Sequence, residues 1–244
     1  MTFLEVRGLA KAFGRRTVLA GIDLEVPRET TFAILGRSGC GKTTLLKILA
    51  GLEDSDSGTI RLDGEEIGAL PPGRRRALYL YQEPLLFPHL DAFENVAFGL
   101  RLRGTAETEV RRRVDAMLAE LELPAEGRKM PHQLSGGERQ RISFGRALIV
   151  EPALLLLDEP FSSLDGETRA AMQQLFQRIA AAHSITALFV THSLKEALLM
   201  GDSIGLLRDG RLAAYPTKED FLRDPESGVG AEIAFWSALS RSAP

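Results

Sequence analysis

The sequence predicts an α/β fold with a doubly wound core, a small antiparallel β layer and an inserted helical subdomain. Three observations predict it. Residues 36–44 read GRSGCGKTT and match the phosphate-loop pattern G-x-x-x-x-G-K-[ST] at every fixed position. Apolar strand-like runs alternate with helical patterns along the chain. Several of these runs end at a polar residue, and ligands of such sheets bind at the carboxyl ends of strands.

The phosphate loop is preceded by a short buried strand, Thr31–Leu35, and followed by a helix with an apolar face at residues 45–52. Its glycines let the backbone wrap closely, so that N–H groups point at phosphate oxygens. Lys42 can reach the β- and γ-phosphates, and the Thr43 hydroxyl can ligate Mg²⁺. We therefore predict a nucleoside-triphosphate site. Its nucleotide-binding residues in this loop are Gly36, Ser38, Gly39, Cys40, Gly41, Lys42, Thr43 and Thr44.

Composition and charge limit the possible functions. The chain has 244 residues, 44% hydrophobic and 26% charged, which is ordinary for a soluble globular protein. Its net charge of −3 argues against a nucleic-acid channel, so no nucleic-acid partner is expected. The one cysteine, Cys40, excludes an internal disulfide and suits a reducing cytosol. No apolar run has signal-peptide length or approaches the ~18 residues of a membrane span, so another chain would supply any spans.

The first part of the chain is expected to form strands. One begins at Phe3, a second runs over residues 18–26, and a third over residues 59–62 ends at the hairpin signal Asp63-Gly64. Together they predict the antiparallel layer beside the phosphate loop. A further strand over residues 77–81 delivers Gln82, and residues 83–90 form an apolar loop broken by prolines.

A helical lobe is expected from about residue 91 to residue 130. Val110, Val114, Leu118 and Leu121 share one face, and the pairs Glu107/Arg111 and Glu109/Arg113 have favourable i,i+4 spacing. The runs Arg74–Arg76 and Arg111–Arg113 are expected on solvated faces, although a partner or lipid headgroups remain alternatives.

The remaining elements return to the alternating pattern. Ser135 and Glu138 have capping-box spacing before a helix that runs to about Ile149. A helix begins at Asp165, and Ser193 and Glu196 predict a second capping box before a helix that Gly201 stops. Strands are expected over residues 154–157, 185–191, 204–207 and 211–215, the last two joined at Asp209-Gly210, and a tail helix from about Thr217 through Phe235, Trp236 and Leu239.

Two carboxylates follow the four-leucine strand. Asp158 is expected to hold Mg²⁺, largely through water, and Glu159 to act as a base on the attacking water. Acidic residues start many turns, but beside a phosphate loop the functional interpretation is favoured. Because neighbouring residues at a strand end point in different directions, we expect the two carboxylates to face different partners.

The segment Leu134–Arg141, LSGGERQR, resembles the signature of ATP-binding-cassette (ABC) ATPases, a group with a P-loop NTPase core. The order of the other motifs over about residues 3–224 resembles this family too. It is most similar to ATPase subunits of bacterial importers for iron, sulfate, molybdate, thiamine, polyamines and sugars. The resemblance implies that Phe13 stacks on adenine, although an aromatic before a turn is often core. It implies catalytic roles for Lys42, Gln82, Glu159 and His192, metal ligation by Thr43, Gln82 and Asp158, and a D-loop at Ser163–Asp165.

The resemblance also implies a head-to-tail homodimer with two MgATP sandwiched between the subunits. Ser135 and Gly137 of one subunit would meet the γ-phosphate held by Lys42 of the other, and Asp165 would also contact nucleotide. Without a ligand, Ser135 is only a good helix cap, but Gly136-Gly137 weakens the helix, which close backbone approach would justify. Implied partners are permease subunits and an extracytoplasmic substrate-binding protein, at the cytoplasmic face of the membrane.

The expected organisation is a single ATPase domain over residues 1–244. Residues 1–90 and 146–216 form the nucleotide-binding core, residues 91–145 the helical subdomain, and residues 217–244 a tail. This tail is too short for the further regulatory domain of sugar-importer relatives, so that form of regulation is not expected.

Departures from the family pattern leave the catalytic groups in place. Arg37, Glu29 and Ser193 stand where proline, glycine and aspartate are usual. An exporter subunit and a soluble ABC ATPase of DNA repair or translation stay open as alternatives. The absence of zinc cysteines, long coiled coils or a duplicated cassette disfavours the soluble class, and the loop at residues 83–90 favours a membrane partner. The sequence does not predict the cargo.

Overall fold

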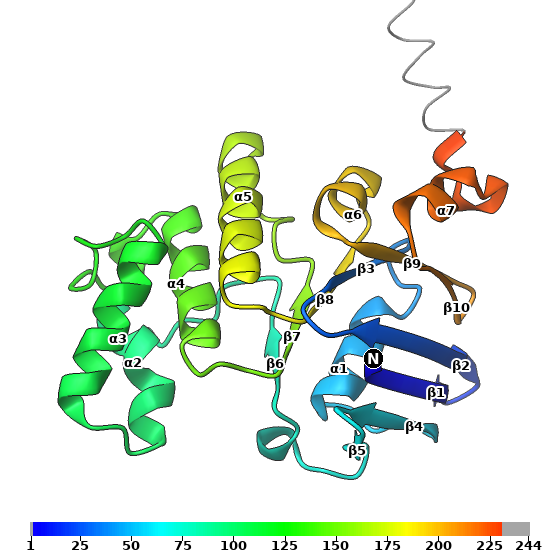
Figure 1. Ribbon diagram of the computed structural model, residues 1–244, viewed down its shortest axis with the longest axis horizontal. Helices are drawn as coiled ribbons and strands as arrows, with labels where there is room; N and C mark the ends of the chain where they lie inside the picture. The colour runs from blue at the N-terminus through cyan, green and yellow to red at the C-terminus, as the bar shows by residue number, and fades with distance from the viewer. Residues whose placement is uncertain (1, 231–244) are drawn as a thin grey trace, which may run out of the picture.

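The computed structural model describes residues 2–230 (Figure 1). The expected tail helix through Phe235, Trp236 and Leu239 lies outside the described residues. Two sheets form the body of the described chain, and helices pack around them (Figure 1). The predicted α/β fold, with a separate antiparallel layer, is confirmed.

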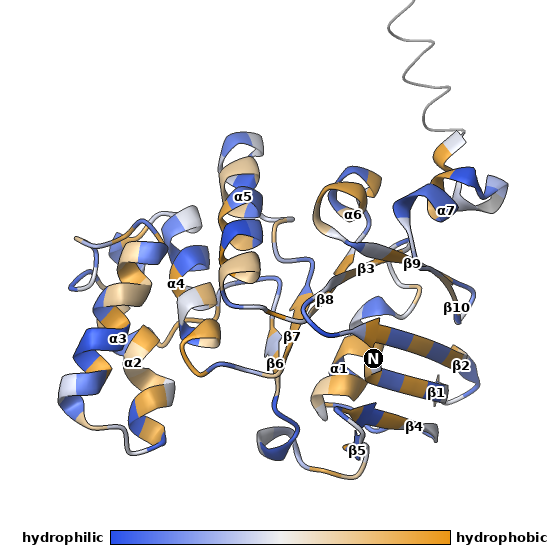
Figure 2. Cartoon of the chain, in the orientation of Figure 1, coloured by the Kyte–Doolittle hydropathy of each residue, from blue (hydrophilic) through white to orange (hydrophobic). Residues whose placement is uncertain are grey.

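The antiparallel sheet has the strand order β2-β1-β4-β5. Its strands are β1 (Thr2–Phe13), β2 (Arg16–Pro27), β4 (Ser57–Leu62) and β5 (Glu65–Glu66). Hydrophobic and hydrophilic residues alternate along β1 and β2 (Figure 2), as expected of a sheet with one face buried. Asp63 and Gly64, at φ 57° and 80°, form the predicted turn between β4 and β5.

The second sheet is mostly parallel, with the strand order β10-β9-β3-β8-β7-β6. Three central strands are buried along their whole length because both faces of the sheet are covered. Only β10 runs antiparallel to its neighbour, through the predicted turn at Asp209-Gly210. The strands are β3 (Thr31–Leu35), β6 (Ala77–Leu80), β7 (Leu154–Asp158), β8 (Ala187–Thr191), β9 (Ser203–Arg208) and β10 (Arg211–Tyr215).

Two hydrophobic cores lie on opposite faces of the parallel sheet. Helix α1 (Lys42–Ala50) fills the space between the two sheets, with Leu45 and Leu49 in one core. The other face is covered by α5 (Gly166–Ala182), α6 (Leu194–Met200) and α7 (Lys218–Arg223). Short 3₁₀ turns occupy Pro72–Arg74, Pro131–Gln133 and Pro225–Ser227. In the part of the chain that the structure describes, no helix is both long and apolar enough to cross a bilayer.

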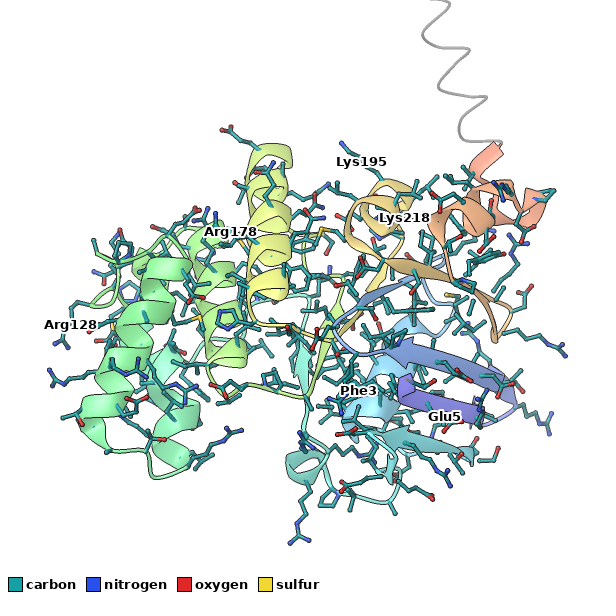
Figure 3. The ribbon with its side chains drawn as sticks, in the orientation of Figure 1. Phe3, Glu5, Arg128, Arg178, Lys195 and Lys218 are labelled. Carbon is teal, nitrogen blue, oxygen red and sulfur yellow. The ribbon has the colours of Figure 1, made fainter. Side chains whose placement is uncertain are left out.

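Three helices form a bundle at one end of the molecule (Figure 1): α2 (Ala92–Leu102), α3 (Glu107–Glu120) and α4 (Gly136–Leu148). The apolar face predicted on α3 is buried against its neighbours. Arg178 of α5, labelled in Figure 3, donates to Glu122 Oε1 at 2.8 Å and so ties the bundle to the neighbouring helix.

One of the two expected ion pairs on α3 forms. Arg111 Nε lies 3.6 Å from Glu107 Oε1. The prediction of a Glu109/Arg113 pair is wrong, because Glu109 pairs with Arg112 instead, at 2.6 Å. Arg113 is the less exposed arginine, and it reaches across the bundle to the Ile149 carbonyl at 2.7 Å.

The prediction that Arg74–Arg76 form a solvated face is wrong for Arg75, which is only 3% exposed. Its guanidinium donates to the carbonyls of Leu70, Ile48 and Gly68 at 2.6–2.7 Å. Ile48 belongs to the last turn of α1, and its carbonyl also accepts the N–H of the capping residue Gly51 at 3.1 Å. Arg75 therefore joins the end of α1 to the loop before β6, and burial lowers its pKa from the ordinary value.

The second predicted capping box is only half formed. Ser193 Oγ accepts from the Glu196 backbone N–H at 3.3 Å, but the Glu196 carboxylate does not return to Ser193. Glu196 Oε2 instead accepts from Thr191 Oγ1 at 2.6 Å, because the carboxylate is buried against the end of β8.

Candidate functional site

The phosphate loop connects the buried strand β3 to α1. Gly36 cannot be replaced without strain, since a Cβ there would lie 2.7 Å from the Leu207 carbonyl oxygen. Gly41 has φ 109°, and a Cβ there would lie 2.9 Å from Val18 Cγ1 of β2. The loop is thus packed between β2 and β9. It enters α1 at Gly41, whose carbonyl accepts the N–H of Leu45 at 2.9 Å, and Thr44 is half-buried in the first turn.

Lys42 folds back over its own loop. Its Nζ donates to the Gly36 carbonyl at 2.8 Å and to the Arg37 carbonyl at 3.2 Å. The side chain is 5% exposed, and its Nζ lies 3.7 Å from Glu159 Oε1. A buried ammonium group, held by two carbonyls beside backbone N–H groups, is suited to binding an anion at the start of α1.

Asp158, at the end of β7, has both carboxylate oxygens occupied by hydroxyl donors. Thr43 Oγ1 donates to Oδ1 at 3.0 Å, and the Tyr79 hydroxyl donates to Oδ2 at 2.6 Å. Sequence motifs did not indicate Tyr79, which lies within an apolar strand. Burial, and then the bond to Asp158, raises the pKa of Tyr79 far above its ordinary value, so the phenol stays neutral and remains a donor.

The donor set at Thr43 and Asp158 fits Mg²⁺. This ion is usually held by one or two carboxylates together with water and substrate phosphates. The structure places one hydroxyl and one carboxylate in contact at the carboxyl end of β7, beside the phosphate loop. Asp158 and Thr43 are therefore the residues that would hold the metal.

Glu159 faces a different set of groups from Asp158, in agreement with the expectation for neighbouring residues. Its Oε2 lies 2.9 Å from His192 Nδ1, and its Oε1 faces Lys42. The residue has φ 45°, a left-handed conformation that is uncommon outside glycine, and its N–H donates to the Val190 carbonyl at 3.1 Å. The turn after β7 thus aims the carboxylate at the end of β8, which delivers His192.

Gln82 lies two residues beyond Leu80, which pairs with Leu157 of β7. Gln82 is therefore beyond the last paired residue of β6, and it is exposed. The predicted metal and catalytic residues follow four neighbouring strands of one sheet: Lys42 and Thr43 after β3, His192 after β8, Asp158 and Glu159 at the end of β7, and Gln82 after β6.

Phe13 is 49% exposed at the end of β1, so the alternative that it is a core residue is wrong. The turn that follows it reaches the phosphate loop, since Arg16 Nη2 donates to the Gly39 carbonyl at 3.3 Å. Lys11 Nζ lies 5.0 Å from the centre of the Phe13 ring. The ring is thus accessible at the start of the turn whose Arg16 contacts the phosphate loop.

A cavity of about 560 Å³ brings His192 together with the phosphate-loop residues Gly36, Ser38, Gly39 and Cys40. Arg208, Asp209 and Ser227 also line it; the sequence predicted Asp209 only as a turn residue and gave no signal for the other two. Several predicted site residues do not line this cavity: Lys42, Thr43, Asp158, Glu159, Ser135, Gly137 and Asp165.

The signature segment opens α4 through the predicted capping box. Ser135 Oγ accepts from the Glu138 N–H at 3.2 Å, and the Ser135 N–H donates to Glu138 Oε2 at 2.6 Å. These bonds lower the pKa of Glu138. A Cβ on Gly137 would lie 2.7 Å from Thr168 Cγ2 of α5, so a side chain there would have to displace Thr168, whereas a Cβ on Gly136 would meet only Arg139 Nη2, at 4.0 Å.

Asp165 caps α5 by accepting from the N–H groups of Glu167 at 3.2 Å and Thr168 at 3.0 Å. These backbone bonds lower its pKa. Arg169, one turn further along α5, donates to the carbonyls of Phe161 and Leu164 and lies 4.0 Å from Glu196. The segment before α5 is thereby linked to the buried carboxylate that holds the end of β8.

Known proteins similar in sequence to this chain include import ATP-binding proteins. The family model described as "ABC transporter" matches residues 19–162. The chain is 41% identical over 239 residues to a spermidine/putrescine import ATP-binding protein, PotA, of Shigella flexneri, covering 96% of this chain and 63% of the relative. It is 42% identical over 222 residues to the protein of that name from Haemophilus influenzae, covering 91% and 60%. The chain thus spans about 60–63% of the length of these curated relatives.

Proposed function

Because the chain belongs to the ABC transporter family, we propose that it binds and hydrolyses MgATP to energise a membrane importer. The observation that carries this proposal is the meeting of three side chains at the phosphate loop. Glu159 lies between Lys42, at 3.7 Å, and His192, at 2.9 Å, while Asp158 beside it contacts Thr43 instead. One carboxylate is thus placed to hold the metal, and the other is placed for chemistry.

Each residue has a distinct task in the proposed reaction. Lys42 and the loop N–H groups bind the β- and γ-phosphates, and Phe13 stacks on the base. Glu159 removes a proton from the attacking water, while His192 orients its carboxylate. Thr43 and Asp158 hold Mg²⁺, with Gln82 as a further ligand, and the ion would neutralise charge on the phosphates.

The proposed working form is a head-to-tail homodimer. Ser135 and Gly137 lie at the start of α4 and Asp165 caps α5, whereas the phosphate loop precedes α1. In the proposed dimer, a second copy brings these three residues to the nucleotide, as the resemblance to the ABC family implies. The start of α4 suits this task because Ser135 caps a helix whose N-terminal N–H groups and dipole favour an anion.

The proposed location is the cytoplasmic face of a membrane, with permease subunits and an extracytoplasmic substrate-binding protein as partners. Leu85, in the loop at residues 83–90, is 53% exposed, and Leu102 at the end of α2 is 79% exposed. Exposed large apolar side chains beside the helical bundle are suited to binding a partner. The names of the relatives favour import over export, and they make spermidine and putrescine the first cargo to test.

The test is reconstitution. The chain is co-expressed with candidate permease and binding-protein genes, purified, and inserted into vesicles with its ATPase side accessible. MgATP should drive cargo from the binding-protein side to the ATPase side, and the Glu159→Gln complex should not. Movement in the opposite direction would favour the exporter alternative, and ATP hydrolysis without a co-purifying permease would favour a soluble ATPase.

A further inference from the structure

We propose that Tyr79 is a positioning residue that fixes the metal-binding carboxylate of Asp158. The proposal deepens the proposed function and rests on its assignment of Asp158 to Mg²⁺. Neither the family motifs nor the expected site residues include Tyr79.

The placement of Tyr79 follows from the register of the sheet. Tyr79 of β6 pairs with Leu156 of β7, two residues before Asp158. Residues two apart in a strand point to the same face, so Tyr79 and Asp158 lie on one face of neighbouring strands. The half-buried phenol reaches the end of β7 and donates its hydroxyl hydrogen to Asp158 Oδ2 at 2.6 Å.

The carboxylate of Asp158 is therefore held at both oxygens by donors from two different elements. Thr43 of α1 donates to Oδ1 at 3.0 Å, and Tyr79 of β6 donates to Oδ2. Two donors on the two oxygens fix the rotation of the carboxylate plane. Groups that hydrogen-bond a metal ligand set its orientation, and their loss weakens metal binding.

The ring of Tyr79 is itself supported. Tyr81 contacts it edge-on, with ring centres 4.7 Å apart and an interplanar angle of 77°. Tyr81 is 43% exposed and immediately precedes Gln82. Tyr79 thus links the proposed metal ligand on β7 to the end of β6, after which comes a further proposed ligand, Gln82.

Tyr79→Phe tests the inference because it keeps the ring and its contact with Tyr81 but removes the donor. Binding of a fluorescent N-methylanthraniloyl ATP is titrated with Mg²⁺ and, separately, measured in EDTA. The Mg²⁺ concentration for half-maximal binding should rise by roughly 10- to 100-fold, while affinity in EDTA stays unchanged. Tyr81→Phe, the matched change two residues away, should leave both values as in the wild type.

A double variant tests whether Tyr79 acts through Asp158. Asp158→Asn should weaken Mg²⁺-dependent binding, and adding Tyr79→Phe to it should cause little further loss. Fully additive losses, or a Tyr79→Phe protein with the wild-type Mg²⁺ dependence, would overturn the inference while leaving MgATP binding in place. Failure of the wild-type chain to bind MgATP would instead overturn the proposed function and the inference with it.

Discussion

His192 Nδ1 lies 2.9 Å from Glu159 Oε2, at the ends of two adjacent strands of the parallel sheet. The other oxygen of the same carboxylate faces Lys42. Glu159 is 20% exposed and His192 is 56% exposed, so the carboxylate lies between a buried lysine and a histidine at the solvent side. In the proposed reaction, this arrangement orients the base and places it next to the phosphate-binding residue.

Glu159→Gln should separate binding from chemistry. The amide keeps the size of the side chain and can still contact His192, but it cannot act as a general base. Hydrolysis should fall ~10²–10⁴-fold, or about 3–5 kcal/mol of barrier, while MgATP binding persists and the dimer accumulates. A phosphate-release assay and size-exclusion chromatography with MgATP measure the two effects.

The companion variant His192→Ala shows whether the histidine acts through Glu159. If His192 only orients the carboxylate, the double variant should hydrolyse ATP no more slowly than Glu159→Gln alone, because the two losses of hydrolysis rate do not add. Wild-type hydrolysis by Glu159→Gln would exclude Glu159 as the base and make His192 the leading candidate.

Lys42→Ala should abolish tight ATP binding. A hydrogen bond to a charged group contributes about 1.5–3 kcal/mol, so affinity measured by calorimetry should fall roughly 10- to 100-fold. Lys47→Ala, at the other end of α1, is the control and should bind normally. Unchanged affinity in Lys42→Ala would show that the phosphate loop is not the nucleotide site.

Alkylation of Cys40 should inactivate the protein, and MgATP should protect it. Cys40 is the only cysteine in the chain, and it lines the cavity of the phosphate loop. Mass spectrometry after maleimide treatment measures the labelled fraction, and equal labelling with and without MgATP would place Cys40 outside the nucleotide site.

Leu85→Asp should break assembly with the permease and leave nucleotide binding intact. Of the three consecutive apolar residues Leu85, Leu86 and Phe87 in this loop, only Leu85 is exposed, while Leu86 packs on the core. Leu86→Asp would therefore also disturb folding. Leu222→Asp, at an exposed position on α7, is the control, and a permease complex that survives Leu85→Asp would contradict docking at this loop.

Arg75→Met should destabilise the fold by roughly 2–4 kcal/mol, because buried carbonyls lose a charged donor. Urea denaturation measures the change in the free energy of unfolding. Arg74→Met is the matched control next to it, since Arg74 is exposed, and it should fall within about 0.5 kcal/mol of the wild type. Equal effects of the two substitutions would contradict the role of Arg75 at the end of α1.

Most of the fold could be predicted from the sequence because its signals are local. Apolar runs gave the buried strands, and Asp63-Gly64 and Asp209-Gly210 gave the turns, since these depend on backbone conformation. The capping box at Ser135 was likewise readable, because its partners are three residues apart. The residues contributed by each strand end to the site followed from the general rule for parallel sheets.

What could not be predicted depends on contacts between distant segments. Arg74 and Arg75 are neighbours of the same type, and only the position of α1 makes one of them a buried donor. Tyr79 reads as an ordinary strand residue until the register of β6 and β7 brings it to Asp158. Gly137 was expected to allow approach of a phosphate, yet Thr168 already leaves no room for a side chain.

The two sheets are joined near the site by two hydrogen bonds, one from a side chain and one from the backbone. Arg16 of β2 donates to the Gly39 carbonyl, and the Ala20 N–H of β2 donates to the Gly210 carbonyl at 2.7 Å. Phe13 belongs to the antiparallel sheet, whereas the phosphate loop extends from the parallel one. The distance between the proposed base-stacking ring and the phosphate-binding loop therefore depends on how the two sheets are held together. A substitution that weakens the contact at Gly210 would change this distance, and with it the fit of the nucleotide, without changing any residue proposed to contact the nucleotide.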